Sequence, residues 1–269
     1  HDRGGKVIAG GTDLLPRLEG GTDYGDVLVD ISALDDLRFI RERKNSIEIG
    51  ALSTYADLLD SSLLRETAVS LIQAAETVGC PQTRSRGTIG GNIMNASPAG
   101  DALPPLLTYD ARVKLLRKDQ EISLPLGELF SGPGQTRLHG GDLLLSVSFR
   151  KPAGDHSSLY LKLGNRKGMN IAVASVALWA TFADGDRFDE VRAALGSVAP
   201  TPVRSPHAEA VLSGAEIKEA ALERAAEAVL QDISPITDVR ASAARRREAA
   251  AVLLKRALKQ ISQERVRHG

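Results

Sequence analysis

The most informative stretch of this sequence is Gly87-Thr88-Ile89-Gly90-Gly91-Asn92, which continues through residues 93–101 to a carboxylate at Asp101. Adjacent glycines allow successive backbone N–H groups to converge on one point, and they leave no side chain to keep a phosphate away. The side chains of Thr88, Asn92 and Ser97 add polar groups that can donate hydrogen bonds. The stretch therefore predicts an anion-binding loop, with Asp101 suited to accept hydrogen bonds from ribityl or ribose hydroxyls.

A second glycine-rich loop, Ala9-Gly10-Gly11-Thr12-Asp13-Leu14, directly follows a predicted strand and offers the same chemistry. One glycine pair is weak evidence because most such pairs are turns. Two such loops, about eighty residues apart, could bind the two phosphates of a dinucleotide between them. Neither loop fits the dinucleotide fingerprint G-x-G-x-x-G or the phosphate loop G-x-x-x-x-G-K-[ST], so a nucleotide-binding fold here is not a Rossmann domain.

The composition is that of a soluble globular protein. The 269 residues, 42% hydrophobic and 25% charged, indicate one large or two medium domains. The formal net charge of zero disfavours a nucleic-acid binder. The single cysteine, Cys80, excludes an internal disulfide, a cysteine-ligated zinc site and an iron–sulfur cluster held by this chain alone. Low cysteine usage favours a reducing compartment, and we expect a cytoplasmic protein without a membrane span.

The pattern along the chain predicts an α+β protein in two parts, residues 1–150 and 155–265. In the first part we expect strands at Val7–Ala9, Val27–Ile31, Arg38–Arg41, Ser46–Gly50, Arg112–Arg117, Glu121–Leu124 and Leu143–Phe149. We also expect helices from an N-cap at Ser53 to Leu59 and over Leu63–Val78, then a loop-rich stretch from Cys80 to Asp101. The second part predicts a three-stranded meander, Ser158–Leu163, Ala172–Phe182 and Glu190–Ala194, and helices over Pro206–Leu212, Lys218–Leu230 and Ala241–Gln263. Since the chain starts without Met and leads straight into a strand, we expect further residues before it.

Positive charge is concentrated in the predicted last helix, although the whole chain has no net charge. Residues 240–269 hold nine Lys or Arg and two Glu, so this segment is +7 and the remainder is −7. The basic residues are predicted to face outward. They could form an ordinary solvated face or a docking surface for an acidic partner.

No familiar catalytic constellation of side chains is present. The sequence has no G-x-S-x-G elbow and no H-E-x-x-H motif, and its five histidines are scattered. We therefore predict no catalytic side chain and no metal ligand in this chain.

The two glycine-rich loops resemble the paired FAD-binding loops of the molybdenum hydroxylase flavoproteins. These are the FAD-binding medium subunits of the xanthine dehydrogenase and aerobic carbon monoxide dehydrogenase type. The resemblance covers nearly the whole chain in order. It continues in residues 29–31, 144–147, 162–166, 194–202 and 234–242.

This resemblance implies FAD bound in a vanillyl-alcohol-oxidase-like (PCMH-type) domain over residues 1–150. A smaller α+β domain, with a three-stranded sheet and helices, would follow over residues 155–265. Ala9–Leu14 would wrap the pyrophosphate, and Leu145 and Lys162 would lie near the isoalloxazine ring, where a positive charge stabilises the reduced flavin. The cofactor-binding residues implied are Val7, Ile8, Ala9, Gly10, Gly11, Thr12, Asp13, Leu14, Gly79, Thr83, Gly87, Thr88, Gly90, Gly91, Asn92, Met94, Ser97, Asp101, Leu145 and Lys162.

The resemblance also implies partners: a small subunit with two [2Fe-2S] clusters and a large subunit with the molybdenum cofactor, assembled as a dimer of heterotrimers. Electrons would pass from the clusters through FAD to NAD+ or another acceptor. Two alternatives stay open. The chain could be a stand-alone FAD-dependent oxidoreductase of the same fold, or a structural subunit that has lost its flavin, although the intact glycine loops argue against the second.

Overall fold

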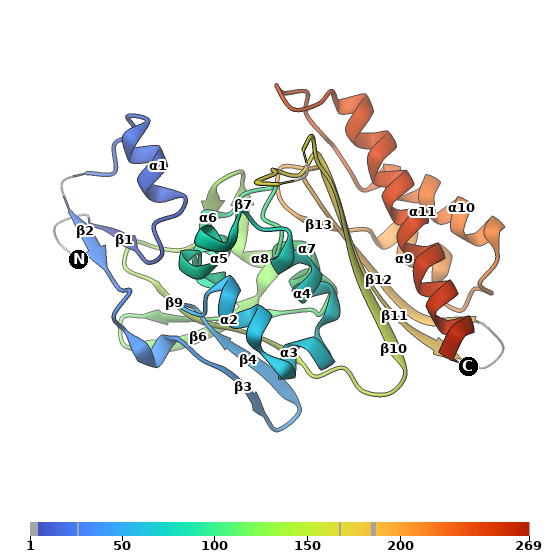
Figure 1. Ribbon diagram of the computed structural model, residues 1–269, viewed down its shortest axis with the longest axis horizontal. Helices are drawn as coiled ribbons and strands as arrows, with labels where there is room; N and C mark the ends of the chain where they lie inside the picture. The colour runs from blue at the N-terminus through green and yellow to red at the C-terminus, as the bar shows by residue number, and fades with distance from the viewer. Residues whose placement is uncertain (1–4, 26, 167, 184–186, 269) are drawn as a thin grey trace.

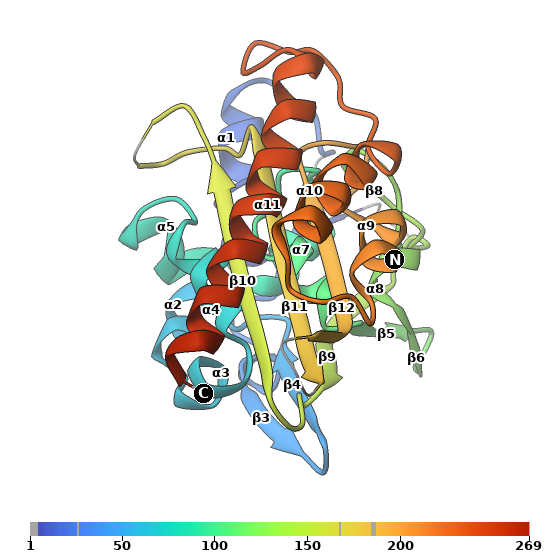
Figure 2. The ribbon, with the colours of Figure 1, turned by 90° about the vertical axis from the view of Figure 1, so that its right-hand side faces the viewer.

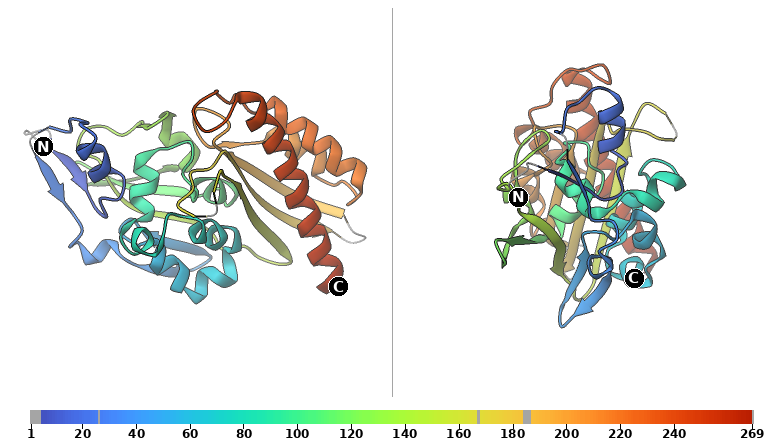
Figure 3. Two further views of the ribbon diagram at one scale, coloured as in Figure 1. Left: turned by 45° about the horizontal axis from the view of Figure 1, so that its top comes forward. Right: turned by 90° about the vertical axis from the view of Figure 1, so that its left-hand side faces the viewer.

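The computed structural model describes residues 5–25, 27–166, 168–183 and 187–268. An N-terminal region and a C-terminal region lie side by side along the long axis of the molecule (Figure 1). A short parallel pair, β1 (Lys6–Ile8) and β2 (Leu28–Asp30), stands with α1 (Leu14–Glu19) at one end. Figure 3 shows these elements at the opposite end from the last helix, α11 (Ala243–His268).

The N-terminal region is built on a five-stranded antiparallel sheet with the order β3-β4-β9-β5-β6. Its strands are β3 (Ile40–Arg43), β4 (Ser46–Gly50), β5 (Arg112–Arg117), β6 (Gln120–Pro125) and β9 (Leu143–Arg150). Ile47 and Ile49 are fully buried on β4, whereas Glu48 between them lies among basic side chains on the other face. This alternation of period two turns one face of the sheet toward the core.

Short helices add buried side chains to the core on the apolar face of that sheet. They are α2 (Tyr55–Asp60), α3 (Ser62–Thr67), α4 (Val69–Glu76), α6 (Ile89–Asn95), α7 (Leu103–Thr108) and α8 (Leu126–Leu129). The turn η1 (Asp35–Leu37) and the helix α5 (Pro81–Arg86) have no buried residue. A small hairpin of β7 (Phe130–Gly132) and β8 (Gln135–Thr136) follows α8. The N-cap of α2 is Thr54, one residue after the predicted Ser53, and a reciprocal capping box with Asp57 fixes it there.

Two helix predictions in this region were wrong. The single helix predicted over 63–78 is divided at Ala68, whose backbone leaves the helical conformation. The stretch from Cys80 to Asp101, which was predicted to be rich in loops, contains the helices α5 and α6. Pro81 occupies the first turn of α5, where its missing N–H costs nothing, so it starts a helix there.

The C-terminal region is an antiparallel sheet with helices on its outer face. Its strands are β10 (His156–Leu163), β11 (Ala174–Ala183), β12 (Arg187–Gly196) and β13 (Val203–Arg204). The three predicted strands are present, and the two-residue β13 adds a fourth. Figure 2 shows α9 (Pro206–Leu212), α10 (Glu219–Ala228) and α11 in front of this sheet; the short turn η2 (Val229–Gln231) follows α10.

The other face of the C-terminal sheet packs on α4 and α7 of the N-terminal region. Along β10, Leu159, Leu161 and Leu163 contact the C-terminal core, so the alternate residues Ser158, Tyr160 and Lys162 face the N-terminal region. Buried side chains therefore meet across the junction. The Tyr109 hydroxyl lies 2.9 Å from Ser158 Oγ and accepts a hydrogen bond from Ser70 Oγ at 3.1 Å. No helix in the described part of the chain is long and apolar enough to cross a membrane.

Candidate functional site

The two glycine-rich loops, far apart in sequence, are in direct contact. A Cβ atom added to Gly10 would lie 1.8 Å from the Arg86 carbonyl oxygen. A Cβ added to Gly87 would lie 3.3 Å from Thr12 Oγ1. Only glycine permits so close an approach of the first loop to the start of the second. The predicted pairing of the loops is therefore a property of the fold.

The first loop presents unused hydrogen-bond donors. Gly11 has a φ of +74°, a left-handed conformation that can turn successive N–H groups toward one side. Within the described residues, no protein acceptor pairs with the backbone N–H groups of Gly10, Gly11, Thr12 or Asp13. These residues are at least partly exposed, so the N–H groups can be reached by a ligand. A pyrophosphate fits this chemistry, since its oxygens only accept hydrogen bonds.

The second loop differs from the prediction. The backbone N–H of Gly90 donates to the Ala51 carbonyl, that of Gly91 to Thr88 Oγ1, and that of Asn92 to the Thr88 carbonyl. These N–H groups are thus used inside the protein. A Cβ on Gly90 would lie 2.5 Å from the Ala51 oxygen, so this glycine permits close packing of α6 on the strand end.

The second loop can bind a ligand through its side chains rather than its backbone. Thr88 accepts a hydrogen bond from Gly91 and keeps its own hydroxyl proton available. Asn92 Oδ1 is buried and has no hydrogen-bond partner among the described residues. An unpaired buried amide oxygen is costly unless something else satisfies it. Asn92 is therefore the residue of this loop that most clearly requires a hydrogen-bond donor from a ligand.

Asp101 and Lys162 form a buried ion pair between the two regions. Lys162 Nζ lies 2.6 Å from Asp101 Oδ2 and 3.3 Å from the Thr77 carbonyl oxygen. The Tyr160 hydroxyl donates to the other carboxylate oxygen at 2.7 Å. Burial raises the pKa of Asp101, although the Lys162 ammonium and these hydrogen bonds act in the opposite direction. The structure thus brings two predicted residues together.

The remaining predicted residues lie on several elements of the N-terminal region. Val7 and Ile8 are in β1, Leu14 begins α1, Met94 is on α6, and Ser97 Oγ accepts from the N–H of Ala99. Gly79 has a φ of +47° and would meet Thr83 at 2.7 Å if it carried a Cβ. Leu145 is the extra residue of a β-bulge in β9, and its carbonyl accepts from Ala51.

Two tyrosines of this site were absent from the predicted set. Tyr160 binds Asp101, and the alternation of β10 could have revealed it, since residues 158, 160 and 162 share one face. Tyr55 is 3% exposed and donates its backbone N–H to Gly87. Its hydroxyl is buried without a partner in the described chain. Burial and the nearby Asp101 and Asp13 carboxylates raise the pKa of Tyr55, so the phenol stays protonated.

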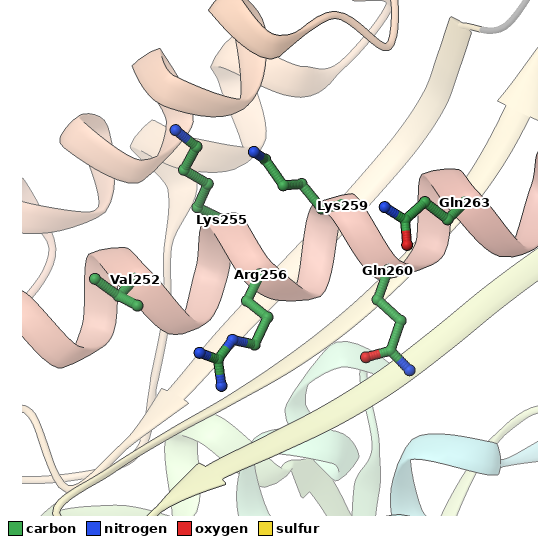
Figure 4. A pocket seen from close by; sticks show the side chains of 6 residues that line it. All are labelled: Val252, Lys255, Arg256, Lys259, Gln260 and Gln263. Carbon is green, nitrogen blue, oxygen red and sulfur yellow. The ribbon is translucent and has the colours of Figure 1, made fainter.

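A shallow pocket along α11 lies elsewhere and contains none of these residues. Figure 4 shows that Lys255 and Lys259 point the same way from this helix, while Arg256 points away from them. Both lysines pair with Glu219 of α10. Arg246 was predicted to face outward but is 2% exposed and pairs with Asp238. Much of the basic charge of α11 is therefore neutralised within the chain.

Two family models match nearly the whole chain. Residues 2–151 match the FAD binding domain in molybdopterin dehydrogenase, and residues 159–261 match the CO dehydrogenase flavoprotein C-terminal domain. The chain belongs to the FAD-binding medium subunits of the xanthine dehydrogenase and carbon monoxide dehydrogenase family. It is the flavoprotein subunit of an oxidoreductase complex. Both glycine loops lie within the part of the chain that matches the FAD binding domain.

Relatives of this medium subunit cover most of its length. The xanthine dehydrogenase FAD-binding subunit of Escherichia coli O157:H7 is 34% identical over 239 residues, 88% of this chain and 82% of that protein. The glyceraldehyde dehydrogenase medium chain of Sulfolobus acidocaldarius is 31% identical over 257 residues, which cover 96% of this chain and 90% of that protein. A structure of carbon monoxide dehydrogenase from Hydrogenophaga pseudoflava superposes with a TM-score of 0.91 at 31% identity, covering 95% of this chain and 88% of that one. The predicted fold class is confirmed.

Proposed function

We propose that this chain carries electrons between [2Fe-2S] clusters of a partner subunit and NAD+ or another acceptor, through FAD. The observation that carries this proposal is the set of unused N–H donors in the first loop, next to Thr88 and Asn92 of the second. When bound, FAD supplies the redox chemistry, and the protein supplies binding and electrostatics.

The residues have separate tasks in this proposal. The backbone N–H groups of Gly10–Asp13 bind the pyrophosphate, and the Thr88 hydroxyl donates to it from the second loop. Asn92 Oδ1 accepts a hydrogen bond from a hydroxyl of the cofactor. Lys162 holds positive charge beside the flavin ring, and Asp101 receives hydroxyls of the ribityl chain. Leu145, on the β9 bulge, excludes water from the same region. No side chain has to act as an acid or a base.

We further propose that residues 1–150 form the FAD-binding domain and residues 155–265 the C-terminal domain. The partners would be a small iron–sulfur subunit and a large molybdenum-cofactor subunit, in a cytoplasmic dimer of heterotrimers. The relatives are named for xanthine, glyceraldehyde and carbon monoxide at similar identities. The substrate is therefore a property of the complex rather than of this chain.

The test is rapid mixing of the purified flavin-loaded chain with its reduced iron–sulfur subunit, followed by addition of NAD+. The proposal predicts that the flavin absorbance near roughly 450 nm bleaches on mixing and that an acceptor restores it. If the isolated chain instead turns over a substrate without any partner, it is a stand-alone oxidoreductase.

A further inference from the structure

A buried arginine joins two strand ends of the C-terminal sheet. Arg246, in the first turn of α11, is 2% exposed. Its Nη1 atom donates to the Val173 carbonyl at 2.7 Å, just before β11 begins, and to the Ser197 carbonyl at 2.9 Å, just after β12 ends. Its Nη2 atom pairs with Asp238 at 2.7 Å. Figure 2 shows that α11 begins at the end of the sheet where β10 ends.

The same end of the sheet carries Lys162. Lys162 pairs with Ser175 across β10 and β11, and Ser175 pairs with Gly196 across β11 and β12. These three residues therefore form one cross-strand row on the sheet. The two carbonyl acceptors of Arg246 lie within two residues of Ser175 and Gly196. Arg246 thus fixes the strand ends on which this row is built.

The loop that ends at Asp101 contacts this row at both ends. The backbone N–H of Ser197, next to Gly196, donates to the Pro98 carbonyl at 2.7 Å. A Cβ atom on Gly196 would lie 3.3 Å from the same carbonyl oxygen, so glycine allows the loop to lie close to the sheet here. At the other end of the row, Lys162 Nζ lies 2.6 Å from Asp101 Oδ2. The position of the Asp101 loop therefore depends on the position of the row.

The backbone of Ser197 has a conformation that serine rarely adopts. Its φ is +64°, in the left-handed region. Such a conformation persists where neighbouring contacts fix it, and here Arg246 binds the carbonyl of Ser197 while Pro98 binds its N–H. The Ser197 hydroxyl is buried without a partner in the described part of the chain. The backbone of this one residue therefore connects α11 with the Asp101 loop.

We propose that Arg246 is a positioning residue for the flavin site, which holds Lys162 and Asp101 in place by fixing the sheet end beneath the Asp101 loop. This inference rests on the proposed function, in which Lys162 and Asp101 contact FAD. It adds that the C-terminal region controls the affinity for FAD and the charge beside the flavin ring. Because positive charge near the ring stabilises the reduced flavin, displacement of the Lys162 ammonium should lower the reduction potential.

The test compares FAD affinity and the reduction potential of the bound flavin between the wild-type chain and Arg246→Met. This substitution removes all three bonds of the guanidinium group. It should weaken FAD binding about tenfold, since small displacements of binding groups are costly, and shift the potential to more negative values. Arg246→Lys keeps a charge beside Asp238 but lacks the planar fork that reaches two carbonyl groups, so it should lie between the two.

Arg247→Met is the matched control on the same helix. Arg247 also donates to two carbonyl groups, those of Ile233 at 3.2 Å and Leu230 at 2.8 Å, which belong to neither the row nor the Asp101 loop. This variant should keep the wild-type FAD affinity and potential. The single tryptophan, Trp179 of β11, is 7% exposed, so its fluorescence reports whether each variant is folded.

Gly196→Ala gives a second test that leaves the bonds of Arg246 in place. The added methyl group would meet Ser175 Oγ at 2.5 Å and the Pro98 carbonyl oxygen at 3.3 Å. It should therefore displace the Asp101 loop from the sheet and also weaken FAD binding. This variant decides the proposal if Arg246→Met does not fold.

Wild-type affinity and potential in both Arg246→Met and Gly196→Ala would overturn the proposal. Equal losses in Arg246→Met and Arg247→Met would overturn it as well, because they would come from general destabilisation of the C-terminal region. A folded wild-type chain that does not bind FAD would contradict the proposed function itself. A wild-type chain that binds FAD, with variants that bind it equally well, would contradict only the role of Arg246.

Discussion

The Nζ atom of Lys162, in the C-terminal region, lies 2.6 Å from Oδ2 of Asp101 in the N-terminal region. Their side chains are only 6% and 10% exposed. A buried charge is tolerated when a partner and further hydrogen bonds compensate for lost hydration, and here Tyr160 and Thr77 provide those bonds. The pair therefore makes the junction of the two regions depend on both side chains at once.

Removing one member of this pair should lower the free energy of unfolding far more than removing both. Lys162→Met leaves the Asp101 carboxylate buried without its counter-charge, and we expect a loss of about 3 kcal/mol in the free energy of unfolding. The double variant Lys162→Met with Asp101→Asn should lose less than Lys162→Met alone. Urea unfolding of the single and double variants measures this coupling. Simple addition of the two single losses would show that the pair contributes nothing to the junction.

Contact between the glycine loops should be required for flavin binding. Gly10→Ala places a methyl group against the Arg86 carbonyl, which belongs to the backbone and cannot move aside easily. We expect the purified variant to contain less than about a tenth of the wild-type flavin, from the loss of preorganised donors. Gly140→Ala is the matched control, because a Cβ there meets nothing within 4 Å. Full flavin content in Gly10→Ala would mean that the loops do not act together.

The hydroxyl of Tyr109 should contribute to the junction independently of the ion pair. Tyr109→Phe removes the partner of the buried Ser70 and Ser158 hydroxyls, yet keeps the ring that stacks on Phe149 at 4.8 Å. We expect a loss of about 2 kcal/mol in unfolding free energy, since two hydroxyls lose a hydrogen bond. Thermal unfolding of this variant is the measurement, with Tyr24→Phe, a partly exposed tyrosine outside the junction, as the control. A melting temperature equal to that of the wild type would argue against a stabilising bond.

Asp238 should make the free energy of unfolding depend on pH in the acid range. Burial alone would raise its pKa, but the backbone N–H of Arg240 and the guanidinium groups of Arg240 and Arg246 hold the pKa well below that of an ordinary carboxyl. Because the folded-state pKa is the lower one, this contribution is present above the unfolded-state pKa and is lost as the pH falls through the folded-state value.

Asp238→Asn therefore tests this linkage directly. At pH 7 we expect a loss of about 3 kcal/mol, since the buried Arg246 keeps its charge without a counter-ion. The difference from the wild type should shrink from about pH 5 downward. Urea unfolding at several pH values follows it, and a difference that is constant with pH would assign the loss to packing.

The sequence predicted the elements that have a clear period. The hairpin β3–β4, the meander β10–β12 and helix α9 agree closely with expectation, because alternation and helical spacing are local properties. Helix α6 was missed because its Gly90 and Gly91 are poor helix formers. Gly90 nevertheless fits there, since it packs on Ala51 without a side chain. That requirement appears only in the folded protein.

The candidate site shows the same division. The loop residues around Gly10 and Gly90 were proposed from their chemistry, whereas the bond from the Gly90 N–H to the Ala51 carbonyl exists only once β4 is in place. The burial of Arg246 was unpredictable from its charge, because two of its partners, the carbonyl groups of residues 173 and 197, are distant in sequence.

The most direct measurement is the flavin content of the purified wild-type chain, from its visible spectrum and from identification of the released cofactor. We predict FAD at about one molecule per chain, with absorbance near roughly 450 nm, and the same content after removal and reconstitution with FAD. A folded, colourless chain that does not take up FAD, with both glycine loops intact, would contradict the assignment of these loops as the FAD site.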